Sequence, residues 1–262
     1  MASPLQVMII GRGLIGGSLG LDLHAQHLAQ SILYHDLNLP DSAPLSAAAN
    51  VDLLIFATPV EATPGLVAAC LPYLHADTIL MDVGSTKSKL IASLKPILGP
   101  KIAQFIFTHP IAGKAKSGFA EAEAGLFATK PVIITPFLET NPAILQKVQQ
   151  LWQSIGAEVT LMTPQEHDAF YGRYSHLSNL LAYTLKAQWQ EKDAPYAHLL
   201  PPSFKAMTRL ADSSPSMWRD ICLSNRDEIL TALHDMQKEI NHLEKLIQQA
   251  EPAALLQYFH SK

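Results

Sequence analysis

Short, almost unbroken apolar runs recur along the first half of the chain and constrain its fold more than any other feature. Residues 53–58 and 79–83 are apolar at nearly every position, without the alternation of a half-exposed strand. Such runs are typical of strands buried on both faces of a parallel sheet. Because helical segments lie between them, we predict an α/β fold with a doubly wound parallel sheet. The other predicted strands are residues 6–10, 32–35, 104–108, 132–135 and 158–162.

The character of the sequence changes at Thr163, after which no segment has the pattern of a strand. Thr163 can cap a helix, Pro164 suits its first position, and Glu166 completes a capping box. We therefore predict a helix from Pro164 to about Gln190 and only helices beyond it. The predicted domains are residues 1–163, containing the sheet, and residues 164–262, entirely helical.

The last long helix carries an apolar seam whose members are four and three residues apart in alternation. This heptad-like spacing can serve packing within one chain, but its regularity also suits a helix-mediated contact between two chains. Two-fold homodimers are common, so we predict a homodimer through the C-terminal helices. The seam consists of Ile229, Leu233, Met236, Ile240, Leu243 and Ile247.

Composition argues against several classes of partner. The net charge of -4 over 262 residues gives no attraction to nucleic acid or to an anionic membrane surface. No apolar run reaches the roughly 20 residues of a membrane-spanning helix, and the apolar N-terminal stretch leads into glycines, unlike a signal peptide. Cys70 and Cys222 are far apart and have no CxxC neighbour, so we expect neither disulfides nor a metal site. A cytoplasmic location fits this pattern.

A glycine motif directly follows the first predicted strand and begins a helix. It consists of Gly11, Arg12, Gly13, Leu14, Ile15 and Gly16. Gly11 allows a tight turn, Gly13 lets the backbone approach a pyrophosphate, and Gly16 lets the helix pack closely on the strand. The free N–H groups at the positive end of the helix dipole would then bind the pyrophosphate. In this context the motif predicts a dinucleotide-binding, Rossmann-type domain, although a glycine-rich turn without a ligand is the alternative.

Asp36, after the second predicted strand, indicates which dinucleotide binds. A carboxylate there can accept hydrogen bonds from ribose hydroxyls and repel a 2′-phosphate, which favours NAD and makes NADP the weaker candidate. Arg12 is an opposing signal, because a guanidinium could attract that phosphate. Thr58 and Pro59, after the third strand, complete the predicted cofactor-binding residues.

Two further polar residues follow the ends of predicted strands, where ligands bind in open α/β sheets. Ser85 lies in the sequence DVGSTK and could hydrogen-bond the substrate or the nicotinamide, or cap the next helix. His109 precedes a loop with proline and glycine. Since histidine titrates near neutrality, His109 could accept a hydroxyl proton while a hydride leaves the same carbon. We predict His109 and Ser85 as catalytic residues.

The helical half contributes candidate substrate-binding residues. His176 and Asn179 are three residues apart and share a helix face. Arg209 could clamp a carboxylate, because its planar guanidinium pairs with carboxylates through two hydrogen bonds. With Lys114, in the loop after His109, these residues form the predicted substrate site.

These motifs, in this order, resemble the prephenate and arogenate dehydrogenases of tyrosine biosynthesis. The segments that carry the resemblance are GRGLIGGSLG, DVGSTK, HPIAGKAKSG, HD followed by SHL, and FKAMTRLADSSPSMWRDI. The resemblance implies a nucleotide-binding domain and a helical dimerisation domain, with His109 catalytic, Ser85 supporting it and Arg209 on a substrate carboxylate. The implied reaction is the NAD-dependent oxidative decarboxylation of prephenate to 4-hydroxyphenylpyruvate.

The sequence departs from the family pattern mainly near the expected substrate pocket. Asn179 stands where the family usually has a second histidine, residues 201–203 replace glycines, and Ala206 replaces an acid. Lys114 occupies a position that is commonly threonine. These departures leave arogenate or an amino-substituted prephenate as alternative substrates.

Two more distant functions also stay open. A β-hydroxyacid dehydrogenase or imine reductase would need a lysine on the interdomain helix, and none is suitably placed near residues 175–185. A non-catalytic NAD-binding regulator would not need His109, Ser85 and Arg209 together.

Overall fold

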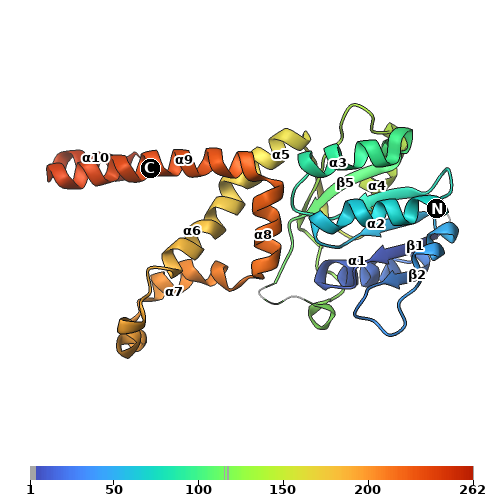
Figure 1. Ribbon diagram of the computed structural model, residues 1–262, viewed down its shortest axis with the longest axis horizontal. Helices are drawn as coiled ribbons and strands as arrows, with labels where there is room; N and C mark the ends of the chain where they lie inside the picture. Colours follow the sequence, from blue (N-terminus) through green and yellow to red (C-terminus); the bar gives the residue numbers. More distant parts are fainter. Residues whose placement is uncertain (1–3, 115, 117, 262) are drawn as a thin grey trace.

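The computed structural model describes residues 4–114, 116 and 118–261 and contains a sheet domain and a set of helices beside it (Figure 1). Seven strands form one sheet in the order β2-β1-β3-β4-β5-β6-β7, and each predicted strand is present. The bounds are β1 Leu5–Ile10, β2 Ala29–His35, β3 Leu53–Phe56, β4 Ile79–Asp82, β5 Phe105–Pro110, β6 Pro131–Ile134 and β7 Glu158–Leu161. The predicted doubly wound α/β architecture is confirmed.

The sheet is mostly parallel, and the pair β5–β6 is its antiparallel exception. The connection between these two strands has only a short 3₁₀ turn, Phe119–Glu121, among its described residues. A parallel return requires a crossover, usually a helix, so a connection without one brings the chain back antiparallel. The prediction of a parallel sheet therefore holds for five of six strand pairs.

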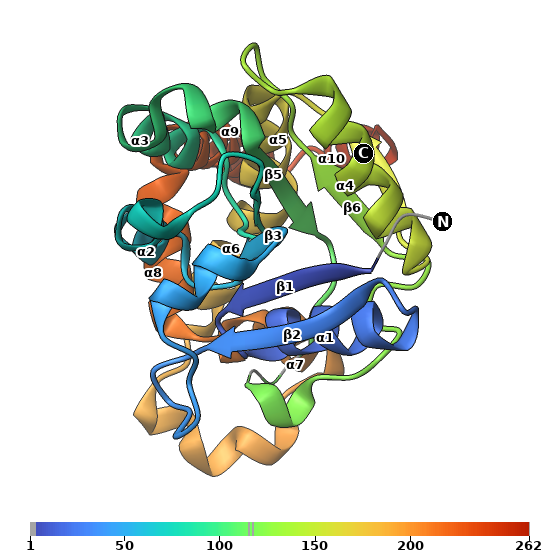
Figure 2. The same ribbon diagram turned by 90° about the vertical axis from the view of Figure 1, so that its right-hand side faces the viewer.

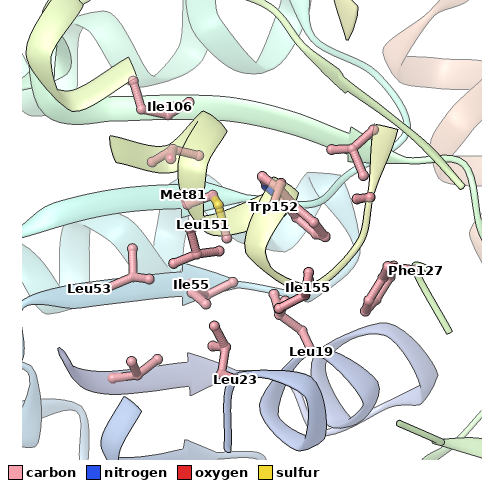
Figure 3. Packing of buried hydrophobic residues seen from close by; sticks show 14 of the residues in the cluster. Leu19, Leu23, Leu53, Ile55, Met81, Ile106, Phe127, Leu151, Trp152 and Ile155 are labelled. Carbon is pink, nitrogen blue, oxygen red and sulfur yellow. The ribbon is translucent and has the colours of Figure 1, made fainter. Parts of the chain in front are cut away.

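Helices cover both faces of the sheet, which explains the unbroken apolar strands. Figure 2 shows the strands lying between two helix layers. Side chains of α1 (Leu14–Ala25) and α4 (Pro142–Ser154) form one core with the strands, and α2 (Thr63–Cys70) and α3 (Ser88–Leu98) form the other. In the first core Trp152 packs among aliphatic residues of β3 and α1 (Figure 3).

The second part of the chain begins with the predicted helix start. The Thr163 hydroxyl accepts a hydrogen bond from Glu166 N at 3.1 Å, and Glu166 Oε2 accepts one from Thr163 N at 2.8 Å. The helix expected from Pro164 to about Gln190 is divided by a π-helix, Gly172–His176, into α5 (Pro164–Tyr171) and α6 (Leu177–Lys186). The remaining α-helices described are α7 Pro202–Thr208, α8 Pro215–Ser224, α9 Arg226–Gln249 and α10 Pro252–His260, with a 3₁₀ helix, Glu191–Leu199, before α7.

Helix α9 extends away from the sheet domain, and α10 lies beside its outer half (Figure 1). Near its start Ile229 is buried and Leu233 packs against the same small core as Trp218. Farther out Ile240 and Ile247 are 53% and 59% exposed. Packing within the chain therefore covers the inner end of the predicted seam but leaves Ile240 and Ile247 largely uncovered. Within the described residues, no helix has the length and apolar character to cross a membrane.

Candidate active site

The glycine turn joins β1 to α1 and has the shape of an anion-binding cradle. Gly11 has φ 97°, and a Cβ on it would lie 2.4 Å from Ala57 O. A Cβ on Gly16 would lie 2.1 Å from Gly11 O, whereas one on Gly13 would meet nothing within 4 Å. Gly13 is the N-cap residue of α1 and supplies no side-chain cap, so no capping side chain occupies the amides of the first turn. This cradle fits the pyrophosphate of a dinucleotide.

Asp36 lies beside this turn because His35 pairs with Ile10 across the parallel strands. Its carboxylate accepts hydrogen bonds from Arg12 N at 2.8 Å and from Asn38 N at 2.9 Å. Partial burial alone would raise the pKa of Asp36, but the hydrogen bonds from Asn38 and Arg12 outweigh it and lower the pKa below its usual value. Asp36 is therefore an anion at neutral pH.

The Arg12 side chain is half-buried and lies against two aromatic rings. Its guanidinium carbon is 3.9 Å from the centroid of Phe119 and 4.7 Å from that of Tyr34. Such cation–π contacts hold the guanidinium against both rings. Thr58 lies next to Gly11, since a Cβ on Gly11 would lie 3.2 Å from Thr58 Cγ2. The next residue, Pro59, is exposed at the surface.

His109 stands on β5 at the boundary between the sheet and the helices. Its Nδ1 atom is 2.8 Å from His167 Nε2, and its ring lies 4.9 Å from the ring of Tyr171. His109, Tyr171 and Ser175 line an open pocket of about 280 Å³ together with residues 110–113. Both parts of the chain therefore contribute walls to the pocket.

A row of hydrogen bonds leads from His109 into the helices and back to the sheet domain. The other ring nitrogen of His167, Nδ1, lies 2.8 Å from Asp168 Oδ1. The Asp168 carboxylate also accepts hydrogen bonds from Lys87 N at 2.9 Å and Ser88 N at 2.7 Å. These two amides belong to the N-terminus of α3, so Asp168 caps a helix of the sheet domain.

Burial keeps three neighbouring histidines, His109, His167 and His176, neutral. Burial above all, together with the positive charge of Lys87, holds the pKa of His109 well below 6.5. Burial also lowers the pKa of His167, partly offset by its hydrogen bond to Asp168, and lowers that of His176 to about 4. A neutral His109 can accept a proton at neutral pH.

A buried ion pair supports the strand that carries His109. Lys87 Nζ lies 2.7 Å from Asp82 Oδ2 and donates to Thr108 O at 2.6 Å, and both charged side chains are at most 2% exposed. The Asp82 carboxylate also accepts a hydrogen bond from Thr108 N at 3.2 Å. These contacts fix the residue before His109.

Ser85 lies half-buried in the turn after β4, and its hydroxyl has no hydrogen-bond partner within the described parts of the chain. Helix α3 begins at Ser88 with Lys87 at the N-cap position, so Ser85 does not cap it. The suggested capping role is wrong, because Asp168 supplies the acceptor instead.

The predicted substrate-binding residues are not gathered in one place. His176 is 2% exposed and bonds Asn225 at 3.1 Å, so it has no open face toward the pocket. Asn179 Nδ2 donates to the carbonyl of Ser175, which lines the pocket, at 3.2 Å. Lys114 pairs with Glu123 at 2.9 Å.

Arg209 begins a 3₁₀ turn, Arg209–Asp212, that packs on α6. Its side chain is exposed, and no ion pair or hydrogen bond engages its guanidinium among the residues described. Arg209 is therefore available to an anion. No contact joins it to His109 in a single chain.

Sequence reasoning missed four residues that surround His109: His167, Asp168, Tyr171 and Lys87. The pair His167–Asp168 belongs to the HD segment noted above, but no role was assigned to it. A signal was present, because an adjacent histidine and carboxylate in the first turns of the interdomain helix can orient a second histidine. The π-helix also marks this region, because π-helical turns occur often at functional sites, but only the structure reveals it.

Comparisons with known proteins agree with this geometry. The family described as prephenate dehydrogenase matches with its nucleotide-binding domain at residues 20–161 and its dimerization domain at residues 163–261. Prephenate dehydrogenase of Bacillus subtilis is 31% identical, covering 97% of this chain and 73% of that protein. Cyclohexadienyl dehydrogenase of Zymomonas mobilis is 30% identical, covering 97% and 92%.

A solved structure is similar over nearly its whole length. It is prephenate dehydrogenase from A. aeolicus in complex with hydroxyphenyl propionate and NAD+, with a TM-score of 0.88 and 29% identity. The match covers 99% of this chain and 96% of that one. Sequence, architecture and the motif order expected above all agree: the chain belongs to the prephenate dehydrogenase family.

Proposed function

We propose that this protein oxidatively decarboxylates prephenate to 4-hydroxyphenylpyruvate with NAD as the oxidant. The observation that carries the proposal is His109, a neutral histidine that lines the pocket and whose Nδ1 is already engaged by His167. Its Nε2 is then the atom available to a substrate hydroxyl. The A. aeolicus relative, with NAD+ and hydroxyphenyl propionate bound together, supports this pairing of ligands.

In the proposed reaction His109 holds one proton for part of the cycle. Nε2 accepts the proton of the ring hydroxyl. A dinucleotide whose pyrophosphate is held at the glycine turn would supply the hydride acceptor for the ring carbon that bears this hydroxyl. When the ring carboxylate leaves as carbon dioxide, the electrons of the broken C–C bond enter the ring and make it aromatic. The proton then returns from His109 to the phenolic oxygen, so the reaction releases no net proton.

Other residues position the reactants in this proposal. Ser85, with an unengaged hydroxyl in the turn after β4, supports the substrate or the nicotinamide. Arg209 binds a substrate carboxylate through its exposed guanidinium, and Asn179 lies close to the pocket wall. Lys114 reaches the substrate only by leaving Glu123. His176 acts indirectly, through its contact with Asn225.

Asp36 supports NAD as the cofactor, because its ionised carboxylate would repel a 2′-phosphate. Arg12 does not oppose this, since its guanidinium is stacked on Phe119 and Tyr34. The active form in this proposal is a homodimer through the C-terminal helices, in line with the dimerization domain matched there.

A second candidate substrate is arogenate, used beside prephenate. The 30% identical relative from Zymomonas mobilis, named cyclohexadienyl dehydrogenase, favours this broader activity, as does the unusual Asn179. The two substrates differ by an amino group in place of a keto oxygen, which only pocket residues can distinguish.

A direct assay decides between them. Purified protein and NAD are mixed with prephenate, with arogenate or with buffer, and NADH formation is followed by absorbance while mass spectrometry identifies the product. We expect NADH and 4-hydroxyphenylpyruvate from prephenate. Tyrosine from arogenate at a similar kcat/KM would establish the broader activity, and NADH at the buffer rate with both compounds would refute the proposal.

A further inference from the structure

The hydrogen bonds behind His109 define a residue pair with a role of its own. We propose that His167 and Asp168 are positioning residues that hold His109 in the tautomer with a proton on Nδ1, leaving the Nε2 lone pair for the substrate. This inference rests on the proposed function for its kinetic consequences. The tautomer itself is a property of the protein without substrate.

The tautomer follows from the donors and acceptors in order along the row. The Asp168 carboxylate is fixed as an acceptor by two backbone amides, and its pKa is lowered by the hydrogen bonds from His167 and Ser88, which outweigh burial. His167 must then donate from Nδ1 to Asp168, so its Nε2 carries the lone pair of the neutral ring. His109 must in turn donate from Nδ1 to that lone pair.

Contacts between the two parts of the chain hold this row in place. Asp168 lies on α5 but caps α3, and the carbonyl of Asp168 accepts a hydrogen bond from Asn225 Nδ2 at 2.8 Å. Next to it Thr86 donates to Ser224 at 3.0 Å across the same boundary. A change in how the helices dock on the sheet domain would therefore alter the proton position on His109.

The charged and titratable groups facing His109 agree with this assignment. They come from α5 (His167, Asp168, Tyr171), from the π-helix (His176) and from the β4–α3 segment (Asp82, Lys87). The Lys87 charge is paired with Asp82, so Asp168 is the anion at the end of the row. When His109 takes a proton, this anion stabilises the new cation through His167, as the carboxylate does in a Ser-His-Asp triad.

The substitution Asp168→Asn tests the assigned tautomers, because it should reverse the direction of the hydrogen bonds from Asp168 through His167 to His109. Asp168 Oδ1 faces His167 Nδ1 and also accepts from Lys87 N, whereas Oδ2 accepts from Ser88 N. With the amide nitrogen of the new side chain at the Oδ1 position, it would donate to His167 Nδ1 while the remaining oxygen still accepts from Ser88 N and the Lys87 amide loses its acceptor, so His167 would carry its proton on Nε2. His109 would then accept at Nδ1 and carry its own proton on Nε2, where the base is needed. In serine-protease triads a histidine in the wrong tautomer costs about 10⁴-fold in kcat. We expect a loss of at least about 10²-fold in kcat, with KM for prephenate and the Kd for NAD nearly unchanged.

Two substitutions at His167 distinguish a role in positioning His109 from a role in filling space. The side chain introduced by His167→Gln keeps an oxygen that can accept from His109 Nδ1, whereas the ring introduced by His167→Phe fills the volume without accepting. We expect His167→Gln to retain kcat within about tenfold of the wild type and His167→Phe to lose on the order of 10²-fold. Equal losses in both variants, with unchanged melting temperatures, would overturn the positioning role.

Nitrogen NMR of the imidazole rings provides a readout that does not need activity. Spectra of uniformly ¹⁵N-labelled protein distinguish protonated from unprotonated ring nitrogens, and the His109 signals are assigned by their loss in His109→Asn. We expect the Nδ1–H form in the wild type, the Nε2–H form in Asp168→Asn, and no change at exposed His75, the internal control. An Nε2–H form in the wild type would overturn the inference, even if an unfolded variant prevented the kinetic comparison. Absence of wild-type activity on prephenate would refute only the proposed function.

Discussion

At the scale of single residues, His109 determines how the rate should vary with pH. The active form is the neutral base, so activity is complete above the pKa of His109 and falls as pH drops through it. Because burial and neighbouring charges hold this pKa well below 6.5, we expect the acidic limb of kcat/KM below pH 6.5. His109→Asn should lose this limb and about 10²–10⁴-fold in kcat. A folded variant with the wild-type limb and rate would contradict the mechanism.

Asp36 determines the preference between NAD and NADP. Removing its negative charge in Asp36→Ser should weaken the discrimination, because the 2′-phosphate of NADP would no longer be repelled. The measurement is the ratio of kcat/KM values for the two cofactors. Asp77→Ser removes the same charge from an exposed position in the connection that leads into β4 and should leave the ratio unchanged. A wild-type preference for NADP would refute the assignment.

Arg209 is predicted to bind the substrate and not the cofactor. Loss of a charge-assisted pair typically costs about 1.5–3 kcal/mol, so Arg209→Ala should raise KM for prephenate roughly tenfold to a hundredfold. The Kd for NAD, measured by titration, should stay near the wild-type value. Arg226→Ala, at another exposed arginine near the start of α9, is the control. A larger effect on NAD than on prephenate would contradict the clamp.

Individual site residues could be predicted where a strand end locates them, and not where docking of distant segments does. His109, Ser85 and Asp36 all follow predicted strands, and the structure places them at those ends. The partner of His109 is 58 residues away in the sequence, and the amide of Lys87 is 81 residues from the Asp168 carboxylate it donates to. No local pattern encodes such pairs.

At the scale of elements, two glycines in the turn between β1 and α1 have different roles: one permits close packing, and the other leaves room for a ligand. Gly16→Ala would force a methyl group against Gly11 O and Ala57 Cβ, and such overpacking typically costs about 1–3 kcal/mol. We expect a lower melting temperature, by roughly 2–4 °C per kcal/mol.

Gly13→Ala is the matched substitution in the same turn. Its methyl group meets no protein atom within 4 Å and extends into the space assigned to the pyrophosphate. We expect an unchanged melting temperature but weaker NAD binding, measured by titration. Unchanged affinity in folded Gly13→Ala would show that the dinucleotide does not approach this turn.

Elements with a local signal were predicted well, and those shaped by contacts were not. The strands and the Thr163 capping box follow from apolar runs and cap residues. The direction of β6 depends on a connection whose described residues contain only the short 3₁₀ turn Phe119–Glu121. The π-helix begins at Gly172, where a Cβ would come within 3.1 Å of Glu228 Cβ on α9, so close approach of another helix accompanies it.

At the scale of the whole molecule, the outer part of the α9–α10 arm carries apolar side chains without a core to cover them. Ile240 and Ile247 on α9 are more than half exposed, as are Leu256 and Phe259 on α10. Burying a side chain of this size stabilises an interface by roughly 1.5–3 kcal/mol. The family match over residues 163–261 is to a dimerization domain, which favours a second copy of this chain as the cover.

The predicted dimer can be tested together with the helix that forms it. Light scattering at micromolar concentration should give twice the chain mass of 28.6 kDa. The double substitution Ile240→Asp and Ile247→Asp should shift the protein to the monomer, because it would bury two unpaired charges in the interface. Leu138→Asp, at a residue 97% exposed on the sheet domain, should leave the mass unchanged. A dimer that survives the double substitution would place the interface elsewhere, and an active wild-type monomer would show that the exposed apolar arm is not covered by a second chain.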